Sequence, residues 1–143
     1  MSLNQERFFI LDQREVMTSG LVNNIIIRIA GELCVRSFES ALKLVVARHA
    51  ILRTTFHAHR DKLLQNIHPH STFELEQYTM VEESNRDVDD EVLQRLAQSV
   101  AQPFHLSSIP PVRCSLHQVS KYSHLFQLSI HRILADAWSG RIF

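Results

Sequence analysis

Residues 112–132 read VRCSLHQVSKYSHLFQLSIHR, and this stretch decides the fold. Val112–Val119 reads as a β-strand, and Leu125–Ile130 alternates between two sets of side chains with the period of two that a strand requires. Ser120–His124 supplies the turn between them. Two strands joined by so short a connection predict a hairpin.

The rest of the chain places helices and strands around this hairpin. The helix over 35–49 is the clearest, because Val35, Phe38 and Leu42 recur at helical spacing. Further helices are predicted over 4–13 and 89–101, and further strands over 22–30, 52–58, 63–67 and 73–78. This mixture predicts an α/β or α+β fold in which helices flank a sheet.

The composition fits one domain. Of its 143 residues, 45% are hydrophobic and 21% are charged, which is ordinary for a globular chain. The formal net charge is zero, so nucleic acid is not an expected partner. No apolar run is long enough for a membrane span, and the N-terminus is too charged for a signal peptide. We expect a cytoplasmic protein with Cys34 and Cys114 reduced.

Polar residues gather where the last predicted strand ends. His131 and Arg132 follow Ile130 directly, and Asp136 comes a few residues later. Catalytic groups are often held at such exits from a rigid sheet. From spacing alone, a solvated strand end with a surface ion pair is the favoured interpretation of these residues.

Three separated segments resemble the signature motifs of the condensation domains of nonribosomal peptide synthetases. The first is similar to Ser-x-Ala-Gln-x-Arg, the second to Arg-His-Glu-x-Leu-Arg-Thr-x-Phe and the third to His-His-x-x-x-Asp-Gly. They lie in order at Ser2–Leu11, Arg48–Phe56 and Ile130–Ser139, with weaker matches at Ala30–Leu33 and Gln102–Leu106. Asn4 and Ala50 depart from the usual alanine and glutamate.

The resemblance implies a chloramphenicol-acetyltransferase-like fold, in which two lobes enclose a tunnel. Residues 1–143 correspond to the N-terminal lobe, with a mixed sheet flanked by helices. Because the chain ends at Phe143 inside what reads as an apolar helix, we expect a truncated domain that lacks its C-terminal lobe and the adenylation domain. The implied partners are carrier proteins, whose phosphopantetheine arms carry the acyl and amine substrates of amide formation in secondary metabolism. No bound cofactor or metal is implied.

The resemblance also assigns roles to the residues of the third motif. His131 takes the position of a mainly structural histidine, and Arg132 the position of the catalytic histidine. Asp136 is the motif aspartate, which in the family pairs with the arginine found here as Arg53. Ala137 replaces a glycine that lets the donor arm pass close to the backbone.

Arg132 is the departure with the largest chemical consequence. A guanidinium stays protonated and cannot accept the proton of an amine, although it can still donate to an oxyanion. We therefore expect impaired amide formation, and no activity from this chain alone. The alternative is a non-catalytic remnant or carrier-protein docking module. Epimerisation and cyclisation relatives fit the motif less well, because the former keep both histidines and the latter use aspartates.

Other candidate sites are weaker. His68 and His70 lie two residues apart, as metal ligands can, but no third ligand cluster is evident, so we expect a solvated loop. His57 and His59 share one strand face and are also expected to be solvated. Ser139 lacks the Gly-x-Ser-x-Gly context of a hydrolase nucleophile.

Overall fold

The fold is described by a computed structural model covering residues 2–14, 18–60, 62–70, 73–79 and 88–135. The helices are α1 (Leu3–Gln13), α2 (Val35–Arg48) and α3 (Val88–Ala101), with 3₁₀ turns η1 (Thr18–Leu21) and η2 (Ala50–Arg53). The strands are β1 (Val22–Ala30), β2 (Thr54–His59), β3 (Lys62–Ile67), β4 (Leu75–Thr79), β5 (Val112–Ser120) and β6 (Ser123–His131). This element order confirms the predicted mixture of helices and strands.

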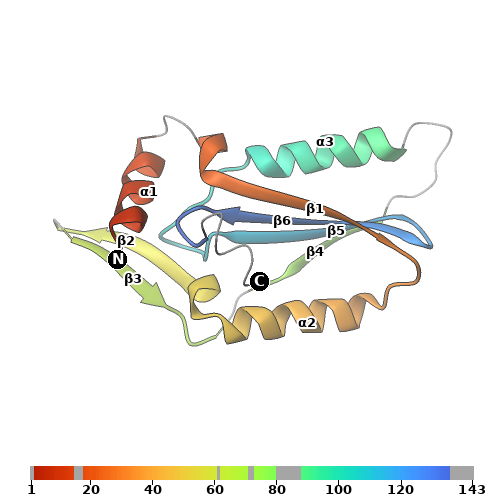
Figure 1. The fold of residues 1–143 in the computed structure, drawn as a ribbon, viewed down its shortest axis with the longest axis horizontal. Helices are drawn as coiled ribbons and strands as arrows, with labels where there is room; N and C mark the ends of the chain where they lie inside the picture. Colours follow the sequence, from red (N-terminus) through yellow and green to blue (C-terminus); the bar gives the residue numbers. More distant parts are fainter. Residues whose placement is uncertain (1, 15–17, 61, 71–72, 80–87, 136–143) are drawn as a thin grey trace.

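Four of the strands form one mixed sheet in the order β1-β6-β5-β4. Strand β6 pairs antiparallel with both β1 and β5, while β4 runs parallel to β5. The hairpin predicted over 112–130 therefore lies at the centre of the sheet. Strands β2 and β3 form a separate antiparallel hairpin, with α1 beside it in Figure 1.

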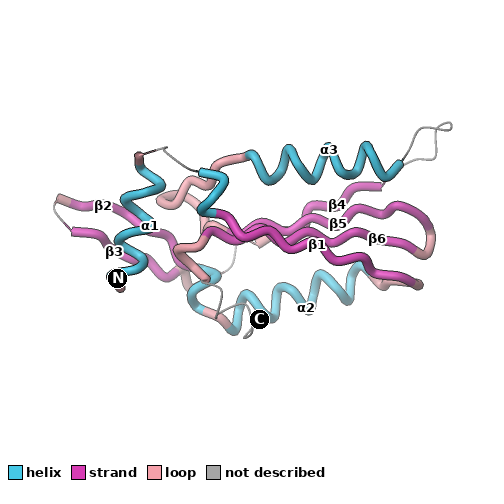
Figure 2. The backbone as a smooth tube through the Cα atoms, turned by 45° about the horizontal axis from the view of Figure 1, so that its top comes forward, coloured by secondary structure: helices cyan, strands magenta, loops and turns pink. Residues whose placement is uncertain are grey.

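Helices α2 and α3 cover opposite faces of the four-stranded sheet (Figure 2). On the α2 side, Phe38 meets Phe126 edge-on, with ring centroids 5.1 Å apart. On the α3 side, Val92 and Leu96 pack against Leu125. These contacts follow from the sequence pattern, since a helix buries its apolar stripe against the nearest apolar strand positions.

The polar face of β6 is buried rather than solvated. Gln127 and Ser129 are both 1% exposed, because α3 lies across this face. Gln127 accepts a hydrogen bond from Ser115 and donates one to the Leu96 carbonyl, both at 3.4 Å. Ser129 donates to Asn24 at 2.6 Å. Hydrogen bonding offsets the cost of removing these groups from water.

Strand β2 begins two residues later than predicted. Residues 50–53 form η2 instead of extended strand, and this turn carries Leu52 into the core. Thr54 closes the turn by donating from its hydroxyl to the Ala50 carbonyl at 2.8 Å. The difference has a local cause, because a threonine hydroxyl that bonds four residues back favours a turn over a strand.

No helix in the described part of the chain is long and apolar enough to cross a membrane.

Candidate active site

The third motif begins where β6 leaves the sheet. The amide of His131 still bonds to the carbonyl of Pro111 at 3.0 Å, but the amide of Arg132 bonds to that of Leu21 at 2.8 Å. A turn then forms as the Leu134 amide donates to the His131 carbonyl at 2.9 Å. The backbone of 131–134 is thus held by Pro111 just before β5, by η1 and by its own turn.

The residues after this turn are anchored in the largest core cluster. Ile133, Leu134 and Ala135 are buried together with Phe9 of α1 and Phe56 of β2. Two side chains hold the carbonyls of this segment: Gln5 donates to Ile133 O and Asn23 donates to Ala135 O, both at 3.4 Å. The first motif therefore supports the third directly, through its glutamine.

His131 is fixed inside the protein. It is 1% exposed, and its Nδ1 accepts the Ile133 amide at 3.1 Å, so the neutral ring carries its proton on Nε2. That Nε2 lies 3.4 Å from Oδ1 of Asp12, outside good hydrogen-bond geometry. Burial lowers the pKa of His131 to about 4, so the pair is not an ion pair at neutral pH. The structural role that the resemblance implies for His131 stays a prediction.

A pocket of about 260 Å³ opens beside the ring of His131, between α1, α3 and the sheet. Asp12 and Phe104 also line it, with apolar residues of α3. Burial raises the pKa of Asp12, against a smaller lowering by its contact with Gln13. Arg132 does not line this pocket, so His131 and Arg132 serve different sides of the strand end.

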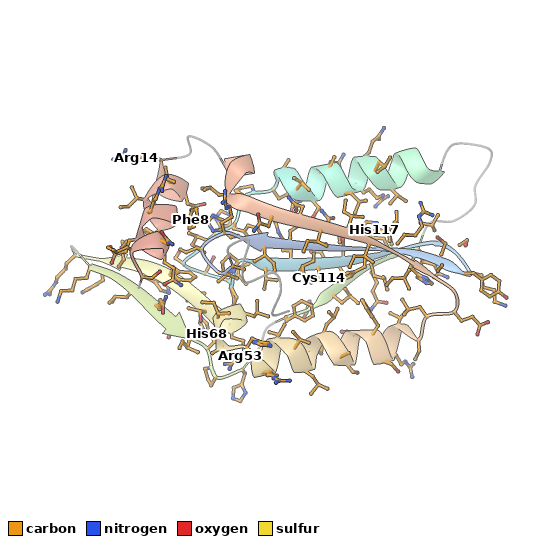
Figure 3. The ribbon with its side chains drawn as sticks, viewed as in Figure 1. Phe8, Arg14, Arg53, His68, Cys114 and His117 are labelled. Carbon is orange, nitrogen blue, oxygen red and sulfur yellow. The ribbon has the colours of Figure 1, made fainter. Side chains whose placement is uncertain are left out.

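Arg132 faces solvent, with its guanidinium folded over α1. Its Cζ lies 5.3 Å from the ring centroid of Phe8, within cation–π range, and Nη1 donates to the Gly20 carbonyl at 3.3 Å. Phe8 is labelled on α1 in Figure 3. Arg132 is thus a fixed, exposed cation that can donate hydrogen bonds but accept none, and its assignment to the position of the family's catalytic histidine stays a prediction.

Arg53, the arginine of the second motif, closes the end of α2. Its Nε and Nη2 donate to the carbonyls of Val46 and Ala47, both at 3.3 Å, and its Nη1 donates to the carbonyl of His68. Figure 3 shows Arg53 and His68 side by side below the β2–β3 hairpin. The predicted partner Asp136 lies outside the described residues, as does Ala137, so the Arg53–Asp136 pair stays a prediction.

A second pocket, of about 540 Å³, is lined by neither His131 nor Arg132. Leu52, Phe73 and Cys114 line it, together with Phe104 and with Arg113, whose Cζ lies 4.0 Å from the Phe104 ring centroid. Burial raises the pKa of the Cys114 thiol to about 12, so this cysteine is no nucleophile.

The structure pairs histidines differently from the sequence. His57 and His68 lie on either side of the Thr55 hydroxyl, within hydrogen-bond distance of it, instead of pairing with His59 and His70. Spacing along the chain could not find this arrangement, because it depends on the register between β2 and β3. Among the described residues, no group of three or more histidine, cysteine or acidic side chains is placed to hold a metal.

Comparison with known proteins finds a family model that matches the whole chain. Residues 1–143 match the family "Condensation domain". Tyrocidine synthase 2 of Brevibacillus parabrevis is 35% identical over 141 residues, which take in 97% of this chain and 4% of that protein. Gramicidin S synthase 2 of Brevibacillus brevis is 30% identical over 144 residues, which take in 99% of this chain and 3% of that protein.

Solved structures share the fold. The X-domain in its complex with OxyB from teicoplanin biosynthesis superposes with a TM-score of 0.79 and 31% identity, over 92% of this chain and 27% of that chain. The starter condensation domain of rhizomide synthetase RzmA superposes with a TM-score of 0.87 and 20% identity, over 99% of this chain and 34% of that chain. The chain thus spans about a third or less of these structures.

Proposed function

The chain belongs to the condensation-domain family of nonribosomal peptide synthetases, and from this premise we propose that residues 1–143 form the N-terminal lobe of such a domain. In this role, segment 131–136 faces a tunnel that a second lobe completes. The substrates are an acyl or peptidyl thioester and an aminoacyl thioester, each on the phosphopantetheine arm of a carrier protein. Adenylation domains load these carriers, and the location is cytoplasmic.

The proposed reaction forms an amide. The amine nitrogen attacks the thioester carbonyl carbon, the new C–N bond forms, the C–S bond breaks, and the pantetheine thiol leaves with the proton that the amine loses. Holding two arms in line supplies much of the rate. The remaining needs are a route for the amine proton and a hydrogen-bond donor for the oxyanion.

The proposal for how this site acts rests on the placement and the charge of Arg132. Its guanidinium is exposed at the strand exit and can stabilise an oxyanion, but it has no lone pair for a proton. The neighbouring His131 is buried and its Nε2 faces Asp12, on the other side of the strand end from Arg132, so we do not assign the amine proton to it. We therefore assign alignment and charge stabilisation to this site, with slow proton transfer.

The test is amide formation by the full-length synthetase with loaded carrier proteins, before and after Arg132→His. General-base catalysis contributes about 10²–10⁴-fold, so the histidine variant should be faster by a factor in this range. Arg132→Gln is the matched control, because it removes the cation without adding a base. An arginine form as fast as the histidine variant would refute the assignment of slow proton transfer.

A second candidate function is docking of a protein that carries no substrate. The sequence left open a non-catalytic remnant or a carrier-protein docking module, and this candidate is narrower than either of them. The X-domain solved with OxyB is 31% identical to this chain, which is more than the 20% of the starter condensation domain and less than the 35% of tyrocidine synthase 2. If Arg132 takes the place of the catalytic histidine, as the resemblance implies, loss of amide formation would leave docking as the remaining role. Calorimetric titration with OxyB and with a loaded carrier protein separates the two functions, since binding of OxyB alone supports docking and binding of the carrier alone supports condensation.

A further inference from the structure

The pocket of about 540 Å³ has the size and the lining of a small-molecule site. Such sites typically enclose about 300–1,000 Å³ and combine apolar walls with a few polar groups. Leu52, Phe73 and Phe104 supply apolar walls here. Cys114, which is labelled in Figure 3, lines the pocket from β5, opposite Leu75 at the start of β4. The walls therefore suit a ligand with an apolar, aromatic body.

Two carboxylates lie at the exposed rim of this pocket. Glu74 directly precedes β4 and Glu76 is its second residue, and both are exposed and line the pocket. Glu76 accepts a hydrogen bond from the Tyr78 hydroxyl at 3.0 Å, which leaves most of its hydrogen-bonding capacity open. A ligand with its apolar body inside the pocket would therefore have its outer end close to acidic side chains.

The guanidinium of Arg113 also lines the pocket but is held against its wall. Its Cζ lies 4.0 Å from the Phe104 ring centroid, its Nη1 and Nη2 donate to Gln102, and its Nε is buried. Burial lowers the pKa of Arg113, and the negative charge of Glu76 opposes this shift. Arg113 thus offsets one carboxylate and offers an anion few donors.

The charges of the lining favour a cation. Counting His105 as neutral, the two carboxylates and the one guanidinium give a net charge of −1. We propose that this pocket binds a small arylalkylamine, with its ring against the apolar walls and its ammonium group beside Glu74 and Glu76. The site is distinct from the strand exit at His131 and Arg132, so this binding does not depend on amide formation.

The test is a saturation-transfer NMR titration of the full chain with three indoles that differ in one group. Tryptamine carries an ammonium, tryptophol a neutral hydroxyl and indolepropionate a carboxylate. Tryptamine should bind with a dissociation constant of about 1 mM or lower, as expected for a ligand of this size. At low salt it should bind about threefold to fivefold more tightly than tryptophol, the range for a solvent-exposed ion pair. Indolepropionate should bind more weakly than either.

Glu74→Gln tests the charge. This variant should remove most of the preference for tryptamine over tryptophol and leave the affinity for tryptophol unchanged. Glu32→Gln is the matched control, because Glu32 is also exposed but does not line the pocket. High salt should act as Glu74→Gln does, since the screening length falls to about 3 Å at about 1 M.

Ile109→Ala tests the apolar contact. Ile109 lines the pocket and is 57% exposed, and its loss should weaken tryptamine and tryptophol alike, by about threefold. Ile67→Ala is the matched control, because Ile67 is 56% exposed but lies on β3 outside the pocket. Circular dichroism confirms that each variant folds.

Three outcomes overturn the proposal. They are a dissociation constant above about 10 mM for tryptamine, equal affinity for tryptamine and indolepropionate, and a preference for tryptamine that survives Glu74→Gln. Binding that Ile67→Ala weakens as much as Ile109→Ala would likewise place the indole outside the pocket and overturn it.

Discussion

The Nε2 atom of His131 lies 3.4 Å from Oδ1 of Asp12, on the buried side of a strand end whose next residue, Arg132, is exposed. An ion pair at this distance would raise the pKa of the imidazole, yet burial lowers it to about 4. Desolvation therefore exceeds the attraction between the two groups. His131 remains neutral at physiological pH, and the geometry of the third motif depends on that neutrality.

This relationship predicts a loss of stability in mild acid. The unfolded chain takes up a proton on His131 near its ordinary pKa of 6.5, whereas the folded chain resists protonation until about pH 4. The contribution of neutral His131 to stability is thus fully present above pH 6.5. As the pH falls to 4, the free energy of unfolding decreases by about 3 kcal/mol, at about 1.4 kcal/mol for each pKa unit. Urea unfolding measured across this range should show the slope.

His131→Asn is the variant that isolates the effect. The asparagine oxygen can accept the Ile133 amide as Nδ1 does, but the side chain does not titrate, so its stability should fall less between pH 6.5 and 4. Asp12 acts in the opposite direction, because burial raises its pKa and makes the folded state bind its proton more readily above pH 3.8. An equal slope in parent and variant would assign the acid sensitivity to other groups.

The hydrogen bonds of the Gln5 side chain link the first motif to the third. Ser2 accepts the Gln5 amide at 3.3 Å as the helix cap, while the Gln5 side chain accepts from the Ser2 amide and from Gln65 and donates to Ile133 O. Ser2→Ala should cost about 1 kcal/mol, the usual loss for a cap. Gln5→Ala removes three side-chain bonds and should cost about 2–3 kcal/mol, at about 1 kcal/mol each.

Hydrogen exchange distinguishes this link from ordinary helix capping. Gln5→Ala should speed the exchange of amides in 131–135, because the segment loses an anchor, and Ser2→Ala should leave that exchange unchanged. Equal effects of the two substitutions on 131–135 would mean that the helix as a whole, and not the Gln5 side chain, supports the motif.

How far the sequence predicts this architecture depends on whether an element is specified locally. The period of two over 125–130 and the helical spacing over 35–49 are local, and both elements were correctly predicted. The burial of Gln127 was not predictable, because it follows from α3 crossing the polar face. Likewise, nothing in the run of isoleucines over 25–27 shows that β1 lies at the edge of the sheet.

The candidate site was also predictable only where it is specified locally. His131 and Arg132 were predicted as neighbours at a strand exit, and the structure places them there. Their opposite orientations depend on contacts with Asp12 and Phe8, which come from a helix more than a hundred residues away in the sequence. A spacing argument cannot supply such a contact, nor the hairpin register that brings His57 beside Thr55.

Arg53 predicts a measurable contribution to stability from the second motif. Arg53→Ala leaves the carbonyls of Val46, Ala47 and His68 without their charged donor, and we expect a loss of about 2–4 kcal/mol in the free energy of unfolding. Arg48→Ala is the control, because this exposed arginine lies in the last turn of α2, near the carbonyls that Arg53 binds, and should cost less than about 1 kcal/mol.

The predicted pair between Arg53 and Asp136 can be measured in the same series. A double-mutant cycle of Arg53→Lys with Asp136→Asn in the full-length protein should give a coupling energy of about 1–3 kcal/mol, since close charged partners are not additive. Additive effects within about 0.5 kcal/mol would remove the pair and leave Arg53 as a helix clamp alone.

Arg132 predicts an unusual pH profile for amide formation. A guanidinium does not titrate below pH 12, so the parental rate should show no inflection attributable to residue 132 between pH 5.5 and 8. Arg132→His should introduce a rise with an inflection near pH 6.5, the ordinary pKa of histidine. Arg132→Gln records the ionisation of the substrate amine, and subtracting its profile isolates residue 132. A histidine profile that matches the glutamine profile would exclude a role for a base at this position.

The outer edge of β1 predicts self-association. Ile25, Ile26 and Ile27 are 44%, 49% and 50% exposed on a strand with no second partner among the described residues. An open edge with apolar side chains is a template for pairing with another strand. Ile26→Lys should weaken association about tenfold or more, as expected when one apolar side chain is lost from an interface and a charge is added. Light scattering at increasing concentration measures the effect.

Leu44→Lys is the matched control, because Leu44 is 71% exposed but lies on α2, where the backbone is already paired. If both lysines weaken association equally, exposed apolar area and not the strand edge drives it.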